Sequence, residues 1–221
     1  MFISAQLKSI HLYPDFERSL KLVKFTTPVS DPCIAFFTSS DLLQFDPPPM
    51  EFLDSFDFTH CTAGRKMCYY GTIPYAYGPI FHAPLAFEFN PYLDNSKSLI
   101  QSKLPFFRFN SALVNHYPKA DSFIPFHSDD VTEIISDSYI LTFSFGSVRK
   151  LEFNSRWPPK CVICNISFLY RSVLLLSKPS QFLLKHGILP ANDHEITEFT
   201  EFGRLSLTFK YLSPPGHTRV S

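Results

Sequence analysis

Short apolar segments alternate with polar residues throughout the second half of this chain. The segments are rich in β-branched and aromatic residues and follow one another at short intervals. Many short strands in one block predict a sandwich or a double-stranded β-helix of the jelly-roll type. We therefore predict a mostly β (α+β) fold, with one short helix at 96–102 that ends before Pro105. The predicted strands are 110–117, 138–146, 148–153, 161–168, 172–177, 181–186 and 203–212.

The last of these segments alternates without exception. Its apolar positions are Leu205, Leu207, Phe209 and Tyr211, and its polar positions are Arg204, Ser206, Thr208 and Lys210. A half-buried edge strand with its polar face in water would show the same alternation. Two cations that flank two hydroxyls favour a different role, because arginine binds a carboxylate through both prongs of its guanidinium. The polar face would then hold a dicarboxylate inside a barrel.

Composition indicates a globular protein of one substantial domain. Of 221 residues, 45% are apolar and 18% are charged, and 25 phenylalanines favour an aromatic, β-rich core. Basic and acidic residues number 20 each, so the formal net charge is zero. A dedicated binder of duplex DNA is usually basic. The balance argues against tight nonspecific nucleic-acid binding, but not against an enzyme that handles one flipped or unpaired base.

Candidate metal ligands lie close together at His127 and Asp129. They are two residues apart, so on a strand both side chains leave the same face. A second histidine from a distant strand would complete a two-histidine, one-carboxylate triad that leaves three positions open on Fe(II). His186 follows an apolar run as a strand residue would, whereas its rival His194 lies in a polar loop. We predict His186 as the third ligand.

These motifs and several others occur in an order that resembles the AlkB-type dioxygenases, a nucleic-acid demethylase family dependent on Fe(II) and 2-oxoglutarate. The resemblance spans 64–212, about two-thirds of the chain. The motifs are Arg65 with Tyr70-Gly71 and Tyr75-Ala76-Tyr77, Asn115-His116-Tyr117, His127-Ser128-Asp129, the strand from Ser138 to Gly146, His186, and Arg204 through Lys210.

The resemblance implies a role for each motif and O2 as the oxidant. It implies iron ligands His127, Asp129 and His186; 2-oxoglutarate contacts from Asn115, Tyr117, Arg204, Ser206 and Lys210; and substrate contacts from Arg65, Tyr70, Tyr75 and Tyr77. It also implies three regions, namely an N-terminal extension at 1–63, a nucleotide-recognition lid at 64–104 and a jelly-roll core at 105–213. Simpler interpretations stay open, since buried polar residues need partners in any protein and tyrosines commonly pack in cores.

Two positions depart from the family pattern. Lys210 replaces the usual second arginine, which keeps the charge but loses the planar fork. Val131 stands where many members carry an acid near the substrate, and Glu133 follows two residues later. These departures bear on substrate handling more than on iron binding.

The function implied by the resemblance is oxidative demethylation of N-methylated bases in single-stranded RNA or DNA, with RNA preferred. A protein side-chain hydroxylase or demethylase of the same superfamily is one alternative, and a catalytically idle jelly-roll binding module is another. The family also includes domains of plant RNA-virus replication polyproteins, an origin that the compact core and irregular N-terminal extension would suit. The expected partner is therefore a methylated single-stranded nucleic acid, and not a membrane.

Cysteine usage and the lack of long apolar runs bear on location. Five scattered cysteines do not suggest a disulfide scaffold, and Cys161 and Cys164 have CxxC spacing with no second pair, which favours strand cysteines over a zinc or redox site. No signal peptide or membrane-spanning run is visible. We expect a soluble protein in a reducing compartment, the cytoplasm, with the nucleus as the alternative.

Overall fold

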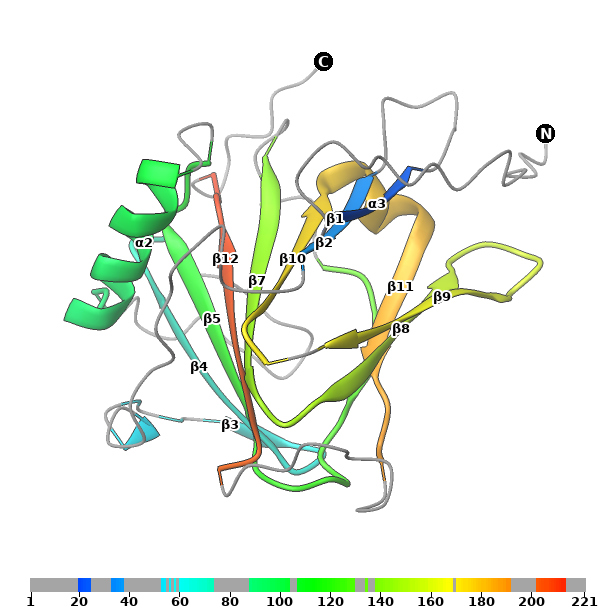
Figure 1. Ribbon diagram of the computed structural model, residues 1–221, viewed down its shortest axis with the longest axis horizontal. Helices are drawn as coiled ribbons and strands as arrows, with labels where there is room; N and C mark the ends of the chain where they lie inside the picture. The colour runs from blue at the N-terminus through cyan, green and yellow to red at the C-terminus, as the bar shows by residue number, and fades with distance from the viewer. Residues whose placement is uncertain are drawn as a thin grey trace.

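The computed structural model describes residues 53, 54, 56, 58, 63–73, 88–102, 107–129, 134, 138–168, 170–191 and 202–213, and the backbone alone at 20–24, 33–37, 60–62 and 103. Two antiparallel sheets face each other (Figure 1). The large sheet has the strand order β1-β2-β10-β7-β12-β5-β4-β3 and the small one β6-β11-β8-β9. In the order just given, the strands of the large sheet are Leu20–Lys24, Cys33–Phe37, Ser172–Ser177, Tyr139–Gly146, Arg204–Lys210, Ser111–Tyr117, Arg65–Gly71 and His60–Thr62. The small sheet consists of Ile124–His127, Leu184–Ile188, Arg149–Ser155 and Val162–Phe168.

The eight strands from β5 to β12 form the predicted jelly roll. The chain crosses repeatedly between the sheets, with β5, β7, β10 and β12 in the large sheet and β6, β8, β9 and β11 in the small one. The mostly β prediction is confirmed. The described strands pair as two separate sheets and do not close into a barrel.

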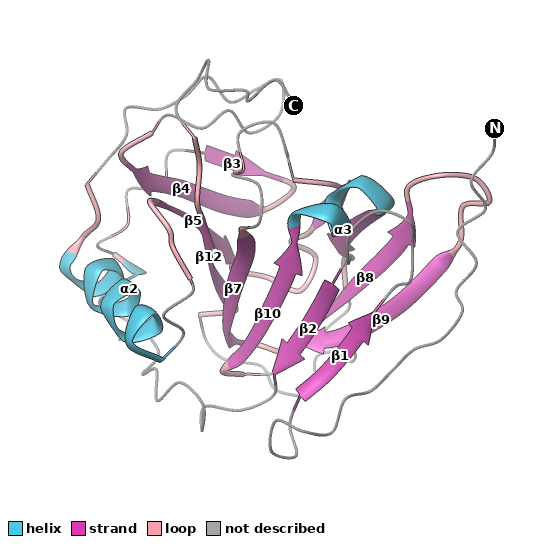
Figure 2. Cartoon of the chain, turned by 90° about the horizontal axis from the view of Figure 1, so that it is seen from above, coloured by secondary structure: helices cyan, strands magenta, loops and turns pink. Residues whose placement is uncertain are grey.

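Apolar side chains fill both sides of the large sheet. One cluster lies between the two sheets and includes Leu113, Phe153 and Leu174. A second cluster lies on the outer face, where helix α2 (Pro91–Lys103) covers β5 and β4 (Figure 2) with Leu93 and Ile100. The inner face is therefore the face available for a site between the sheets.

Both described helices differ from the prediction. The helix expected at 96–102 begins earlier, at Pro91, because the side-chain oxygen of Asn90 accepts a hydrogen bond from the Leu93 amide at 2.9 Å and caps the first turn. The strand expected at 181–186 is wrong in its first half. Helix α3 (Lys178–Leu183) precedes β11, with a proline in its first turn.

Residues 65–71, which belong to the predicted nucleotide-recognition lid, form strand β4 of the large sheet. It pairs with β5, the strand that carries the Asn115-His116-Tyr117 motif. Strand β2 pairs with β10 and strand β1 with β2, so described parts of the predicted N-terminal extension lengthen the large sheet. The division at residues 63 and 104 stays a prediction.

Strand β12 lies inside the large sheet and not at its edge. It pairs with β5 on one side and β7 on the other, so the edge-strand interpretation of its alternation is wrong. Both faces are buried, with Leu207 on the outer cluster and Ser206 facing the small sheet. Gly203 enters the strand with φ +73°, and a side chain there would collide with the Tyr117 carbonyl oxygen. In the described part of the chain, no helix is long and apolar enough to cross a bilayer.

Candidate active site

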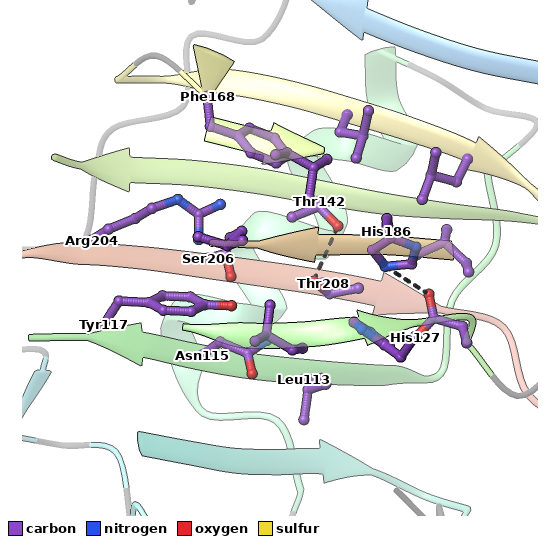
Figure 3. A pocket seen from close by; sticks show the side chains of 17 residues that line it. Leu113, Asn115, Tyr117, His127, Thr142, Phe168, His186, Arg204, Ser206 and Thr208 are labelled. Carbon is purple, nitrogen blue, oxygen red and sulfur yellow. Dashed lines mark hydrogen bonds and ion pairs between the residues drawn. The ribbon is translucent and has the colours of Figure 1, made fainter. Parts of the chain in front are cut away.

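The three candidate metal ligands meet at one end of the space between the sheets (Figure 3). His127 of β6 pairs directly with His186 of β11, and their ring centroids are 4.4 Å apart. Asp129 follows β6, and its Oδ2 lies 3.9 Å from His186 Nε2. The structure thus brings together the two histidines and the carboxylate that the sequence predicted, although they come from distant parts of the chain. His194, the rival of His186, lies outside the described residues.

Buried surroundings set the charge of these three groups. Burial, with a smaller contribution from the neighbouring His127, lowers the pKa of His186 to about 3. Burial also lowers the pKa of His127. Burial alone would raise the pKa of Asp129, but Lys210 and the two histidines hold it well below its usual range. Two neutral imidazoles and one carboxylate are the protonation states that bind a metal.

Hydrogen bonds orient the first two ligands. His127 Nδ1 lies 2.9 Å from the Pro125 carbonyl oxygen, which can only accept, so Nδ1 carries the proton and Nε2 is left for a metal. The Asp129 amide donates to Gln181 Oε1 at 3.0 Å, and Ser128 Oγ donates to the Leu184 carbonyl at 2.7 Å. Gln181 belongs to α3 and is buried. The sequence did not reveal this residue, because the apolar run at 181–186 predicts a strand.

The donor set fits Fe(II), although the side chains are not yet closed around a metal. Among the described residues, no three His, Cys, Asp or Glu side chains meet the geometry of a complete metal site. Lys210 Nζ pairs with Asp129 Oδ1 at 2.6 Å, whereas Oδ2 faces His186. The 3.9 Å between Asp129 and His186 would also have to shorten slightly. Nitrogen and oxygen donors that cover one side of an ion, with room opposite, are what a non-haem iron site needs.

Arg204 lies deeper between the sheets and is almost fully buried. Its guanidinium lies 5.1 Å from the ring centroid of Tyr117 and 4.7 Å from that of Phe168, and Nε donates to Ser144 Oγ at 3.1 Å. Burial lowers the pKa of Arg204 to about 10, which still leaves it charged at neutral pH.

No described carboxylate pairs with Arg204, and its Nη1 has no hydrogen-bond partner in that part of the chain. A buried cation with an unused N–H is costly unless an anion joins it. The carboxylate end of a bound ligand fits this requirement. The orphaned nitrogen is the observation that matches 2-oxoglutarate to the residues present.

Asn115 and Ser206 lie between Arg204 and the metal ligands and line the same pocket (Figure 3). They are paired across β5 and β12. Arg65 Nη1 donates to Asn115 Oδ1 at 2.7 Å, which turns the Asn115 amide nitrogen toward other acceptors. Thr208 Oγ1 hydrogen-bonds with Thr142 Oγ1 at 3.1 Å, also in the pocket wall. The polar face of β12 therefore faces the ligand space, as its alternation predicted.

The predicted substrate residues fare differently. Arg65, a predicted substrate contact, is buried and donates to Asn115, so the structure places it behind a predicted cosubstrate residue and not at an exposed surface. Tyr70 lies in the outer cluster, edge-on to Phe56 with ring centroids 5.8 Å apart, so the large sheet separates it from the pocket. Its predicted stacking on a base does not fit this position. Tyr75, Tyr77, Val131 and Glu133 lie outside the described residues.

Other candidate groups have structural surroundings. His116 Nε2 hydrogen-bonds with the Phe202 carbonyl oxygen at 2.6 Å, consistent with a hydrogen-bonded core histidine. Cys161 precedes β9 and Cys164 lies within it, and both are free. Burial raises the pKa of Cys164 to about 11, which makes its thiol unreactive.

A jelly roll with two histidines and a carboxylate at one end of its pocket, and a buried arginine at the other, is the arrangement of the Fe(II)- and 2-oxoglutarate-dependent oxygenases. The family profile described as the 2OG-Fe(II) oxygenase superfamily matches residues 62–210. The chain belongs to this superfamily, and its resemblance to the AlkB-type members is confirmed. The family implies Fe(II), 2-oxoglutarate and O2.

Curated relatives and a solved structure agree with this assignment. The chain is 33% identical over 96 residues to the mouse alpha-ketoglutarate-dependent dioxygenase alkB homolog 3, and 31% identical to the human protein over the same length. Each match covers 43% of this chain and 33% of the relative, so the matched segment spans about a third of those proteins. The solved structure of OsALKBH1 shares the fold, with a TM-score of 0.51 and 15% identity over 81% of this chain and 97% of that one.

Proposed function

We propose that this protein demethylates N-methylated bases in single-stranded nucleic acid, RNA by preference, with Fe(II), 2-oxoglutarate and O2. One observation carries the proposal: a pocket that holds His127, Asp129 and His186 at its mouth and an anion-deficient Arg204 at its base. The alkB homolog 3 proteins, which are similar over 96 residues, are named alpha-ketoglutarate-dependent dioxygenases. The AlkB resemblance supports a methylated base as substrate.

The residues divide the work between metal and cosubstrate. His127 Nε2, His186 and the Asp129 carboxylate would hold Fe(II). Arg204 would bind the far carboxylate of 2-oxoglutarate through its unused Nη1, held in place by Ser144 and two aromatic rings. When bound, iron and 2-oxoglutarate supply oxygen activation, in which one oxygen atom enters succinate and the other oxidises the N-methyl carbon, released as formaldehyde.

Neighbouring side chains would orient the cosubstrate. Asn115 directs its amide nitrogen away from Arg65, and Ser206 lies beside it on β12. Tyr117 forms one wall around the Arg204 guanidinium and lines the pocket. These polar groups and the apolar walls Leu113, Ile140 and Leu176 would exclude bulk water from the cosubstrate.

Parallel measurement of succinate and formaldehyde tests the proposal. Single- and double-stranded RNA and DNA oligonucleotides carrying N-methylated bases should stimulate succinate formation, with one formaldehyde per turnover and single strands preferred, because an unpaired base avoids the cost of extrusion. If a methylated or unmodified peptide stimulated succinate formation and no oligonucleotide did, the protein side-chain alternative would replace this function. Iron titration tests the idle-module alternative, which predicts no specific binding.

Further proposals concern organisation and context. Tyr75 and Tyr77 would supply the aromatic surfaces for the target base, and 1–63 would extend the core. A reducing compartment, the cytoplasm or alternatively the nucleus, suits the free thiols of Cys161 and Cys164. If the chain is a domain of a viral replication polyprotein, it would act close to the viral RNA, which would be its substrate.

A further inference from the structure

The loop between β8 and β9 extends away from both sheets (Figure 1) and carries Trp157, the one tryptophan of the chain. The side chain of Trp157 is 57% exposed, the highest value among the described large apolar residues. Tryptophan is seldom left this open in a protein without a partner, because its ring buries more apolar area than almost any other side chain. We call residues 156–161 the hairpin tip.

Hydrogen bonds hold the hairpin tip in one shape. Trp157 Nε1 donates to the Phe182 carbonyl at 2.9 Å, and Ser155 Oγ donates to the Trp157 carbonyl at 2.6 Å. The Arg156 amide donates to the Leu183 carbonyl at 2.9 Å, and Arg156 Nη1 donates to the Gln181 carbonyl at 3.1 Å. The exposed indole is thus fixed to α3 and does not swing freely. A fixed aromatic surface loses little entropy when a ligand stacks on it.

Three basic residues, Arg156, Lys160 and Lys185, lie at or beside the hairpin tip, although the chain as a whole is neutral. The sequence has no acidic residue within 153–186. The guanidinium carbon of Arg156 lies 5.7 Å from the Trp157 ring centroid. Lys160 and Lys185 are exposed, and Lys185 pairs with Asn154 just before the tip. An anionic partner is therefore favoured at this surface over a neutral or basic one.

The strand register places the hairpin tip at the metal end of the pocket. His186 pairs with Phe153, and Leu184 pairs with Ser155, so the tip begins directly beyond the end at which the ligands lie. Trp157 is the fourth residue after Phe153, at most about 14 Å along the chain. Arg204, by contrast, pairs with Gly146 at the far end of the pocket. A strand with one base at the metal could therefore lay a flanking nucleotide across the tip.

We propose that the hairpin tip is a second contact for single-stranded nucleic acid, in which a base flanking the target stacks on Trp157 and phosphates meet Arg156, Lys160 and Lys185. Aromatic rings interleaved with cations are how single strands are bound without sequence preference. The partner class rests on the proposed function, and the tip would set how much of the strand beyond the reacting base contributes to affinity. An acidic peptide is the competing ligand for the same chemistry.

Intrinsic fluorescence reports on this site alone, because Trp157 is the only tryptophan. Unmethylated single-stranded oligonucleotides of increasing length should quench its emission once they reach from the pocket to the tip, and a single nucleotide should not. Trp157→Ala should weaken binding of a fluorescently labelled long oligonucleotide by about 5- to 150-fold. Trp157→Phe should restore most of the affinity, since it keeps a stacking ring.

Matched controls lie at the other end of the same hairpin. Tyr170 is 40% exposed and has Arg171 at 5.5 Å from its ring, yet it lies at the end away from the metal. Tyr170→Ala should leave binding unchanged. Arg156→Gln with Lys160→Gln should lower the salt dependence of binding by about 0.7 in slope for each phosphate that is no longer neutralised, whereas Lys150→Gln should not.

The outcomes separate this inference from the proposed function. Demethylation of an oligonucleotide without quenching, and with equal affinity in Trp157→Ala and Tyr170→Ala, would overturn the tip contact and leave the function intact. Quenching by oligonucleotides without demethylation would support the tip contact and overturn the function. Quenching by an acidic peptide but by no oligonucleotide would overturn both.

Discussion

Lys210 Nζ lies 2.6 Å from Asp129 Oδ1, and both side chains are buried. The ion pair joins the last residue of β12 to a candidate metal ligand 81 residues earlier. It keeps the carboxylate ionised inside the protein, where burial alone would favour its protonated form. Lys210, expected from the family resemblance to contact 2-oxoglutarate, is thus placed to control the charge of the metal site.

Lys210→Met should raise the pKa of Asp129, because the positive charge of Lys210 then no longer offsets the effect of burial. A buried carboxylate left without its partner costs roughly 3–5 kcal/mol, so unfolding free energy at pH 7 should fall by about that amount. The depressed pKa stabilises the fold above the carboxylate's unfolded value near pH 4 and loses that effect as pH falls through the folded value. The difference in unfolding free energy between parent and variant should therefore narrow as the pH falls below about 4. Urea unfolding at several pH values measures this difference.

Lys210→Arg is the control, since it keeps the charge and restores the residue usual in the family. It should retain both stability and activity. A difference in unfolding free energy between parent and Lys210→Met that did not narrow as the pH fell below about 4 would contradict the ion-pair account.

His127→Ala, His186→Ala and Asp129→Asn should each abolish specific Fe(II) binding and turnover. We expect this loss because His127 pairs directly with His186 and Asp129 Oδ2 lies 3.9 Å from His186 Nε2. His116→Gln is a matched control, because His116 is also a buried histidine but bonds to the Phe202 carbonyl away from the pocket. Metal binding can be titrated anaerobically. A His116→Gln variant that failed to bind iron as completely as His186→Ala would argue against the assignment.

Arg204→Met should remove binding of 2-oxoglutarate more than it disturbs the fold. The guanidinium is buried without an anion among the described residues, so its removal takes away a desolvated charge. An ion pair broken on one side is worth roughly 3–5 kcal/mol, which corresponds to more than about a hundredfold in affinity. Thermal unfolding with and without 2-oxoglutarate should show stabilisation of the parent but not of the variant. Equal stabilisation of both would refute the carboxylate anchor.

Gln181→Ala should weaken Fe(II) binding by about 10- to 100-fold, the usual effect of removing a residue that orients a metal ligand. Gln181 Oε1 accepts the Asp129 amide, so the substitution leaves that amide without its partner. Gln101→Ala is the control, because Gln101 belongs to helix α2, which covers the outer face of the large sheet. Anaerobic iron titration of both variants makes the comparison. Unchanged iron affinity in Gln181→Ala would show that Asp129 is oriented by other contacts.

Tyr70→Phe should leave demethylation unchanged, because Tyr70 packs against Phe56 on the outer face of the large sheet. Tyr75→Ala or Tyr77→Ala should weaken demethylation far more than the slow decay of 2-oxoglutarate without substrate, since stacking contributes roughly 1–3 kcal/mol per base. Formaldehyde and succinate measured in parallel separate the two effects. A large decrease in Tyr70→Phe would return that residue to the substrate site.

The alternation of side chains along a strand, which has a period of two, was sufficient to predict which residues share a face. The alternation of β12 placed Arg204 and Ser206 on the inner face, and the two-residue spacing placed His127 and Asp129 together. The same period explains the failure at Tyr70. Tyr69 and Tyr70 are adjacent on β4, so one belongs to the cluster between the sheets and the other to the outer cluster. Nothing in the Tyr-Tyr pair itself says which faces inward.

Contacts between distant residues could not be predicted from the chain. Gln181 reaches the Asp129 amide across 52 residues, and Lys210 reaches the Asp129 carboxylate across 81. Both contacts depend on how β6, β11 and β12 meet in two different sheets. Helix α3 was predictable in part, because Ser177 and Pro179 are helix-start residues, but the apolar run that follows resembles a strand.

Strand β12 has a consequence for which dicarboxylate the pocket accepts. It pairs with β5 from Arg204 to Lys210 and with β7 from Arg204 to Phe209, and neither pairing contains a bulge. Strand geometry fixes the backbone span at about 20 Å between Arg204, the proposed carboxylate anchor, and Lys210, which pairs with the candidate metal ligand Asp129. The distance between the two ends of the site is therefore a property of the backbone. A keto acid one methylene shorter or longer than 2-oxoglutarate would meet a spacing that side-chain rotamers cannot reset.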